Sequence, residues 1–414
     1  MLQKESLKKS FFWNTLGSAL NSFNSLFFLI IVTRINGVND AGIFTLCFAT
    51  ACMFYCISVY SGRTYQVTET DESITDNEYI INRIICSIVM IMISMMFAII
   101  KGYNSYKLLI LLLLTLFKAS EAVSDVFHGI LQKNEKLYVV GKSLFFRSLL
   151  NIILFLIIDL LTNSVIYSCF SLIISNLIIL FIVDVKQSFK YKEKLIKINL
   201  KAVFKIFTFG FYTFSFMLIS NYLINIPRYG MDLLNDESLQ TIFGIIVMPA
   251  TMIMLLCQFI LQPVITKLKQ FYFKNDRKHF LSIIYKLSLS IIIIGILCLI
   301  IGYFIGIPIL NLLYGLELNN YLINLLIIIV GAVFYTLANI ITNAMVIFRK
   351  TKVQFYIYLV VTVISYFICN TLIKYFDFNG ATYTYLIMMF MLLLFNTINF
   401  IIFMNNNKNW KGNK

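Results

Sequence analysis

The sequence predicts an all-α protein that crosses a membrane about twelve times, and three observations lead to this fold class. Hydrophobic residues make up 60% of the 414 residues and charged residues only 13%, where a soluble globular protein carries about 25% charge. The chain contains repeated apolar runs of roughly 20 residues, each long enough to cross a bilayer as a helix of about 30 Å. The connections between these runs are alternately rich and poor in Lys and Arg. The lipid bilayer is therefore the expected surrounding of this chain.

Twelve apolar runs fit the length of a membrane span and are separated by charged or Gly/Asn-rich turns. A basic segment, residues 184–202, divides six runs from six. We therefore expect two six-helix bundles, at residues 1–183 and 203–414, joined by a cytoplasmic linker. The predicted spans are residues 11–32, 41–60, 80–100, 108–131, 138–161, 165–183, 203–226, 241–260, 281–305, 321–348, 353–373 and 381–404.

The net charge of +15 is explained by membrane topology, and no nucleic-acid partner is expected. Cytoplasmic connections of membrane proteins hold an excess of Lys and Arg. Most basic residues fall in one alternating set of connections, which includes both ends of the chain. Both termini are therefore predicted to be cytoplasmic. The opposite set of connections holds only Arg34, Lys101, Lys107, Arg228 and Lys374.

Residue patterns typical of catalysis or metal binding do not occur in the sequence. The eight cysteines lie inside apolar runs and form no C-x-x-C pair, so we expect no metal, cofactor or disulfide. The GKS triplet at residues 141–143 lacks the earlier glycine of a phosphate-binding loop. The connections predicted to face outward are short, the longest being residues 227–240. An enzyme is therefore not expected.

The predicted span at residues 108–131 carries four ionisable side chains on one face. At 100° per residue, Lys118, Glu121, Asp125 and His128 fall within an arc of about 80°. A charge at mid-membrane costs on the order of 3 kcal/mol, so Lys118 and Glu121 should face protein or water. We expect these side chains to line a polar cavity.

Two alternatives to the cavity stay open for this helix. The charges could form a purely structural ion pair, either Lys118 with Glu121 or Glu121 with Arg147. The span could also stop near Phe117, so that the charged part lies along the membrane surface.

Polar side chains repeat at helical spacing on three other predicted spans. A single polar stripe is explained by hydrogen bonding between helices. Several stripes, spread over both halves of the chain, favour a shared polar cavity. The polar residues predicted to line it are Asn14, Ser18, Asn21, Asn151, Asn221 and Asn225.

The ionisable groups in the spans are mainly cationic, so the cavity should attract an anion. The planar fork of arginine suits phosphate. Glu121 and Asp125 are candidates for binding a coupling cation or proton. The residues predicted to contact an anion are Arg34, Arg63, Lys118, Arg147 and Arg228.

Pro249 interrupts the eighth predicted span and should kink it. We consider it a candidate hinge. A static bend is the alternative.

Five segments resemble the polysaccharide transporter family, which is also called the Wzx-type oligosaccharide flippase family. It belongs to the MOP superfamily, together with the MATE multidrug extruders and the lipid II flippase. The likeness rests on motifs over about the first 260 residues, and on topology thereafter. The segments are VTRINGVNDAGIFTLCFA (32–49), SGRTYQVTE (61–69), FHGILQKNEKLYVVGKSLFFR (127–147), IPRYGMD (226–232) and IFGIIVMPA (242–250).

This resemblance implies a two-bundle flippase in the bacterial inner or plasma membrane. It would translocate undecaprenyl-pyrophosphate-linked oligosaccharide repeat units to the outer leaflet by alternating access, for capsule, O-antigen or exopolysaccharide biosynthesis. A polysaccharide polymerase and a chain-length regulator are its expected partners. Arg34, Arg63, Arg147 and Arg228 lie in the matched segments, so the resemblance implies that they contact the pyrophosphate or the cavity.

Three other functions are weighed against the flippase. A drug exporter of the same superfamily would prefer an acidic cavity for a cationic substrate. A membrane enzyme of polysaccharide assembly, such as a polymerase or acyltransferase, would need catalytic groups and a larger outer loop. A scaffold without transport activity would tolerate charge changes in the cavity.

Overall fold

The computed structural model describes most of the chain, and every regular element in the described residues is a helix, which confirms the all-α prediction. The chain divides into two compact units, Met1–Leu218 and Ile219–Lys414, which are described one at a time. Residues 192–198 of the predicted basic linker lie outside the described residues. The described residues are 2–60, 62–68, 74–191, 199–348 and 350–406.

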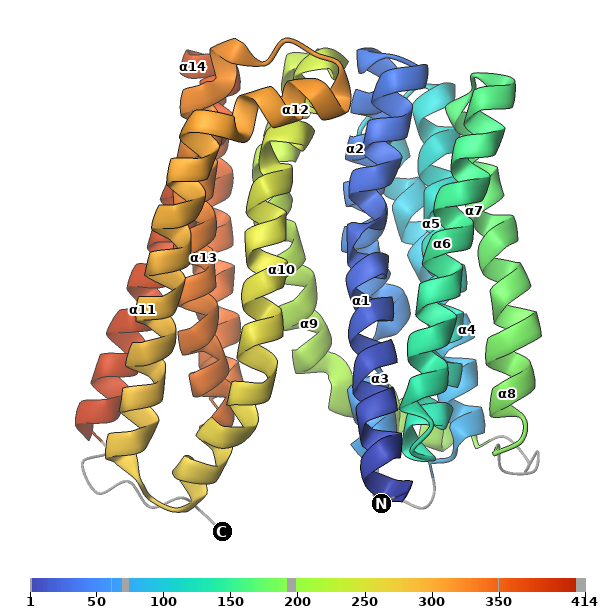
Figure 1. Cartoon of the computed structure of the whole chain (residues 1–414), viewed down its shortest axis with the longest axis vertical. Helices are drawn as coiled ribbons and strands as arrows, with labels where there is room; N and C mark the ends of the chain where they lie inside the picture. Colours follow the sequence, from blue (N-terminus) through green and yellow to red (C-terminus); the bar gives the residue numbers. More distant parts are fainter. Residues whose placement is uncertain (1, 61, 69–73, 192–198, 349, 407–414) are drawn as a thin grey trace. The chain divides into compact units, whose positions relative to one another are not determined.

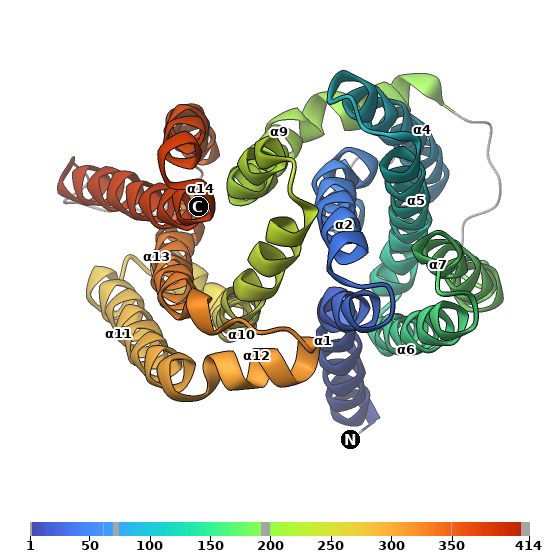
Figure 2. The same cartoon turned by 90° about the horizontal axis from the view of Figure 1, so that it is seen from above.

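Six long helices form the first unit (Figure 1). Helix α5 packs against α2, α4 and α7, while α1 packs along α6 (Figure 2). The charged helix of the sequence is thus central to its unit. The elements are α1 (Leu2–Ile35), α2 (Val38–Val59), α3 (Gly62–Thr68), α4 (Asp76–Ile100), α5 (Ser105–Lys133), α6 (Leu137–Thr162), α7 (Val165–Ile179), the π-helix η1 (Leu180–Val185), α8 (Lys186–Ser188) and the start of α9 (Leu200–Met231).

Capping residues explain where two of these helices begin. Thr75 and Glu78 form a capping box at the start of α4. The side chain of Asn104 accepts a hydrogen bond from the Lys107 backbone N–H at 2.8 Å and so caps α5. From this cap α5 continues to Lys133 without a break at Phe117, so its charged part stays inside the packed unit.

The second unit contains the rest of α9 and five further long helical segments. Helix α13 lies at its centre and packs against α10, α11 and α14. The backbone of Asp377, at φ 45°, divides α14 into two helices. The elements are η2 (Asp232–Leu234), α10 (Glu237–Phe273), α11 (Arg277–Ile301), the π-helix η3 (Gly302–Gly306), α12 (Ile307–Tyr314), η4 (Asn319–Tyr321), α13 (Leu322–Ile347) and α14 (Thr351–Asn406).

Each of the twelve predicted spans corresponds to a helix. Ten helices of the described chain are long and apolar enough to cross a membrane. Helix α14 counts once among them, although its two halves match the predicted spans 353–373 and 381–404. Helix α5 is not among the ten because its charges interrupt the apolar run, but it covers the predicted span 108–131. The protein is therefore a multi-pass membrane protein.

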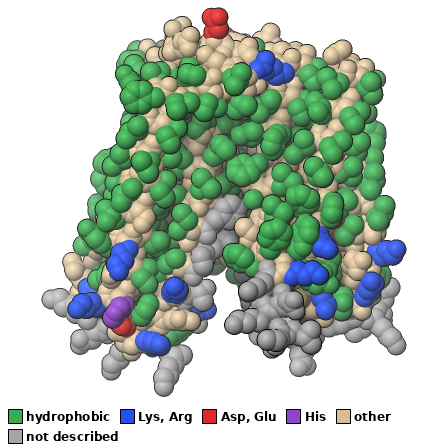
Figure 3. All heavy atoms as spheres, viewed as in Figure 1, with side chains coloured by type: hydrophobic (Ala, Val, Ile, Leu, Met, Phe, Trp, Pro, Cys, Tyr) green, Lys and Arg blue, Asp and Glu red, His purple; other side chains and the backbone are tan. Residues whose placement is uncertain are grey.

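Most of the Lys and Arg side chains visible in Figure 3 gather, in each unit, at one end of the helices, and hydrophobic side chains cover the length between. This is the distribution expected of helices that cross a bilayer. The cytoplasmic position of both termini stays a prediction. The sequence did not predict the short helices α3 and α12 or the π-helices η1 and η3.

Candidate functional site

A cavity of about 200 Å³ lies inside the first unit, between α1, α2 and α5. Three predicted site residues meet in it: Asn21 from α1, and Lys118 and Glu121 from α5. Helix α1 also contributes Asn24 to its wall. Its remaining lining residues are Ser22, Ser25, Phe28, Phe48, Cys52 and Phe117. The structure therefore contains a polar cavity at the charged part of α5.

Lys118 and Glu121 form an ion pair within this cavity. The Lys118 Nζ atom lies 2.7 Å from Glu121 Oε2, and the two side chains are 13% and 10% exposed. The same Nζ lies 4.9 Å from the ring centre of Phe48 and 5.0 Å from that of Phe117, distances typical of cation–π contacts. Lys118 and Glu121 thus form the ion pair that was one alternative, and they also line the predicted cavity.

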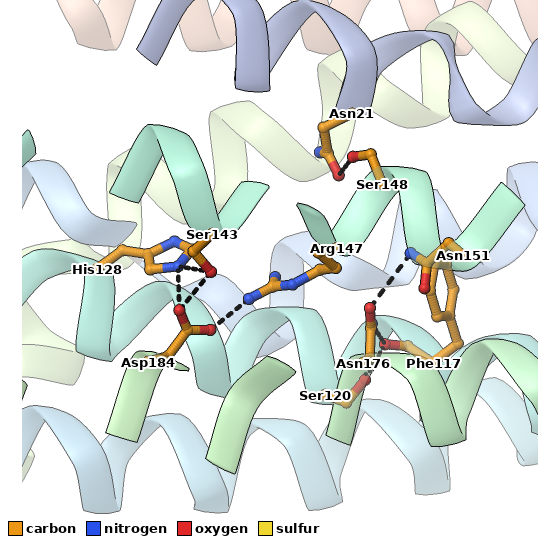
Figure 4. Close-up of polar contacts among 10 residues, drawn as sticks. All are labelled: Asn21, Phe117, Ser120, His128, Ser143, Arg147, Ser148, Asn151, Asn176 and Asp184. Atoms are coloured by element: carbon orange, nitrogen blue, oxygen red, sulfur yellow. Dashed lines mark hydrogen bonds and ion pairs between the residues drawn. The ribbon is translucent and has the colours of Figure 1, made fainter. Parts of the chain in front are cut away.

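Arg147 belongs to a second, fully buried polar group, built around Asp184 (Figure 4). Asp184 accepts hydrogen bonds from Arg147 at 2.5 Å and from Ser143 Oγ at 2.5 Å, and lies 3.0 Å from His128 Nε2. Asp184 is 0% exposed and Arg147 2%. Within the described residues Arg147 forms no ion pair with Glu121, so the alternative pairing of Glu121 is not observed. The guanidinium of Arg147 is instead held by Asp184.

Asp184 is a candidate functional residue that the sequence pattern does not predict. The predicted span ends at Val183, which places Asp184 in the basic linker. The π-helix η1 instead continues from α7 and keeps Asp184 inside the unit, facing α5 and α6. The one available signal was an acidic residue flanked on both sides by valine at the end of an apolar run.

Asn151 takes part in a third buried group, which joins α6, α7 and α5 (Figure 4). Its amide donates to Asn176 Oδ1 at 3.3 Å, and its carbonyl accepts from Ser175 Oγ. Asn176 in turn donates to Ser120 Oγ at 3.0 Å. Each of these bonds joins two helices, as polar residues in membrane bundles commonly do.

Asp125 lies between two arginines. Its carboxylate is 3.8 Å from Arg63 Nε on α3 and 3.4 Å from Arg83 on α4. Arg83 is 2% exposed and also donates to the backbone carbonyls of Ser58 and Val59, at the end of α2. In the sequence Arg83 indicates only membrane topology, because its contact with the end of α2 depends on how α2 and α4 pack.

The remaining predicted site residues do not line the cavity between α1, α2 and α5. Arg34 is exposed in the last turn of α1, and Arg228 is half-buried on α9 in the second unit. Helix α10 is continuous through Pro249. The roles predicted for these residues, and the hinge, stay predictions. Half-buried on α1 are Asn14 and Ser18, and half-buried on α9 are Asn221 and Asn225.

The fold of the chain is similar to that of solved membrane transporters. An inward-facing multidrug resistance MATE family transporter matches 96% of this chain and 99% of its own, with a TM-score of 0.75 and 10% identity. The lipid II flippase MurJ, in an inward closed conformation, matches 93% of this chain and 86% of its own, with a TM-score of 0.73 and 15% identity. At these identities the likeness is one of fold.

The sequence itself is similar to a curated relative, the capsular polysaccharide biosynthesis protein CapF of Staphylococcus aureus. The two are 26% identical over 389 residues, which cover 93% of this chain and 97% of that protein. No protein-family model matches the chain. The relative and the two transporter structures confirm the resemblance inferred from the motifs, and the similarity extends well beyond the first 260 residues.

Proposed function

We propose that the protein is a flippase that moves undecaprenyl-pyrophosphate-linked oligosaccharide repeat units from the inner to the outer leaflet of the bacterial cell membrane, for surface polysaccharide biosynthesis. The observation that carries this proposal is the similarity, over nearly the whole chain, to a capsular polysaccharide biosynthesis protein in a chain with a transporter fold. A polar cavity inside a helix bundle whose outer surface is apolar supports it, because a sugar head group needs shelter from lipid.

Transport would proceed by alternating access. Sugars would lie in polar surroundings within the helices while the polyprenyl tail stays in the lipid. Arg34, Arg63 and Arg228 keep their proposed role as pyrophosphate contacts, since they are at least partly exposed. A pyrophosphate that bound Arg147 would have to displace Asp184.

The two carboxylates proposed to bind a coupling proton or cation are already paired. Glu121 pairs with Lys118, and Asp125 pairs with two arginines, so a coupling proton or cation would compete with these partners.

The alternatives fit these observations less well. A drug exporter for organic cations would need an unpaired acid in its cavity, whereas the Glu121 carboxylate is paired with Lys118. A polymerase or acyltransferase would need a catalytic constellation, and the solved structures described above are of transporters. We propose that the protein is not an enzyme, that both termini face the cytoplasm, and that a polymerase and a chain-length regulator work beside it.

The first test is to delete the gene and determine where lipid-linked oligosaccharides accumulate. A membrane-impermeant, sugar-modifying probe on intact cells distinguishes the two leaflets. Repeat units that stay unmodified until the cells are permeabilised would support the flippase. Repeat units that reach the outer leaflet but remain unpolymerised would point to a polymerase instead and would contradict the transport function.

A further inference from the structure

The cavity between α1, α2 and α5 carries no net formal charge. Lys118 and Glu121 neutralise each other at 2.7 Å, and the other lining residues are uncharged. A phosphate that entered would meet the Glu121 carboxylate and would have to break this ion pair to reach Lys118. The cavity is therefore a poor site for the pyrophosphate, in contrast to the cationic cavity that the sequence predicts.

The residues that line the cavity include one buried hydrogen-bond acceptor without a donor and two further acceptors that can take another hydrogen bond. Asn24 is 4% exposed, and its Oδ1 atom has no hydrogen-bond partner. The Ser22 hydroxyl gives its hydrogen to the backbone carbonyl of Ser18 at 2.8 Å, which leaves the oxygen as an acceptor. The Glu121 carboxylate can also accept more than one hydrogen bond. A matching ligand needs several O–H or N–H donors, because a buried acceptor without a donor is costly.

The volume of the cavity and the apolar part of its wall further limit which ligands fit it. A volume of about 200 Å³ lies below the range of drug-sized sites, which begins at about 300 Å³, and suits a single monosaccharide ring. Phe28, Phe48 and Phe117 present aromatic surface to the cavity, against which the C–H face of a sugar ring can pack. A sodium ion would also satisfy the oxygen acceptors, but the Lys118 ammonium already holds the carboxylate such an ion needs.

We infer that this cavity binds one uncharged, hydroxyl-bearing sugar ring of the substrate, and that the pyrophosphate binds elsewhere. The inference rests on the proposed function, since it names which part of the lipid-linked substrate enters the first unit. Asn24 is assigned as the residue that accepts a hydrogen bond from the sugar, with Glu121 and Ser22 as further acceptors.

The test compares two lipids on the purified full-length protein in lipid nanodiscs. One lipid is undecaprenyl pyrophosphate carrying N-acetylglucosamine, and the other is undecaprenyl pyrophosphate without sugar. Affinities are measured for the wild type, for Asn24→Leu, and for Asn39→Leu, a matched control at an exposed position on α2. We expect Asn24→Leu to lose about five- to tenfold in affinity for the sugar-bearing lipid and none for the bare lipid. Asn39→Leu should bind both lipids as the wild type does.

Four other outcomes would contradict the assignment of the cavity to a sugar ring. An equal loss for both lipids would place the pyrophosphate in the cavity and overturn the inference, as would no loss for either lipid. A rise in thermal stability with sodium over choline, seen in the wild type and absent in Asn24→Leu, would make the cavity a cation site instead. If the wild type binds neither lipid while it remains folded, the proposed function itself fails, and the inference fails with it.

Discussion

Arg147 and Asp184 form an ion pair that neither lipid nor water reaches, with His128 and Ser143 on the same carboxylate. The desolvation of two such charges is costly, and their attraction offsets it only while both are present. Arg147→Glu would bring two carboxylates together at a buried position. A loss of transport in this variant would therefore first have to be separated from a loss of folding.

The corresponding prediction concerns stability. Arg147→Gln should lower the free energy of unfolding by about 3–5 kcal/mol, because it leaves the buried Asp184 carboxylate without its guanidinium partner. The double variant Arg147→Met/Asp184→Leu should recover most of this loss. Thermal unfolding in detergent measures both, with Lys101→Gln, at an exposed position, as a control expected to change stability by less than about 0.5 kcal/mol. Wild-type stability of Arg147→Gln would argue against the pair.

The pair of Lys118 and Glu121 is accessible to a double-mutant cycle. Lys118→Met and Glu121→Gln should each destabilise the protein, and the double variant should be more stable than the sum of the two effects predicts, by about 1–3 kcal/mol. The same unfolding measurement yields this interaction energy. Additive effects would mean that the two groups do not interact, and the cavity would then hold a free ammonium.

At the scale of helices, α1 and α6 approach closely at two glycines. A Cβ atom on Gly17 would lie 2.2 Å from the Gly141 carbonyl oxygen, and one on Gly141 would lie 2.3 Å from the Trp13 carbonyl carbon. Small residues at a crossing let two backbones come together, which is how many membrane helices associate. The GKS triplet at residues 141–143, which lacks the earlier glycine of a phosphate-binding loop, thus contributes a packing glycine.

Gly141→Ala should therefore destabilise the first unit by about 1–3 kcal/mol, since the methyl group meets backbone that cannot move aside. The matched control is Gly306→Ala, whose methyl group would meet only the flexible end of Leu325, at 2.8 Å. Unfolding temperature and the yield of monodisperse protein are the measurements. Equal tolerance of both substitutions would show that α1 and α6 separate without loss.

At the scale of the whole molecule, the even number of predicted spans puts both termini on one side of the membrane, and the distribution of Lys and Arg predicts that this side is the cytoplasm. Leu233→Cys, in the connection between α9 and α10, should react with an impermeant maleimide on intact cells. Lys278→Cys, at the start of α11, should react only after permeabilisation. Both positions are exposed, and unmodified wild-type protein is the control for its native cysteines. The reverse pattern would place both termini outside the cell.

The number, type and approximate bounds of the spans could be predicted from the residues alone, because hydropathy and span length are local properties of the chain. The exceptional character of α5 could be predicted as well, because a 3.6-residue period places Lys118 and Glu121 on one face. The motifs identified the transporter resemblance that the structural and sequence relatives confirm.

Which charged side chains meet depends on how the helices pack. Lys118 and Glu121 are three residues apart, so their pairing was among the alternatives the sequence offered. Arg147 and Asp184 are 37 residues apart and meet because η1 extends α7 and turns Asp184 toward α6. Local periodicity carries no information on such a contact. For the same reason the sequence predicted a cationic cavity, whereas the packing of α1, α2 and α5 encloses one whose charges cancel.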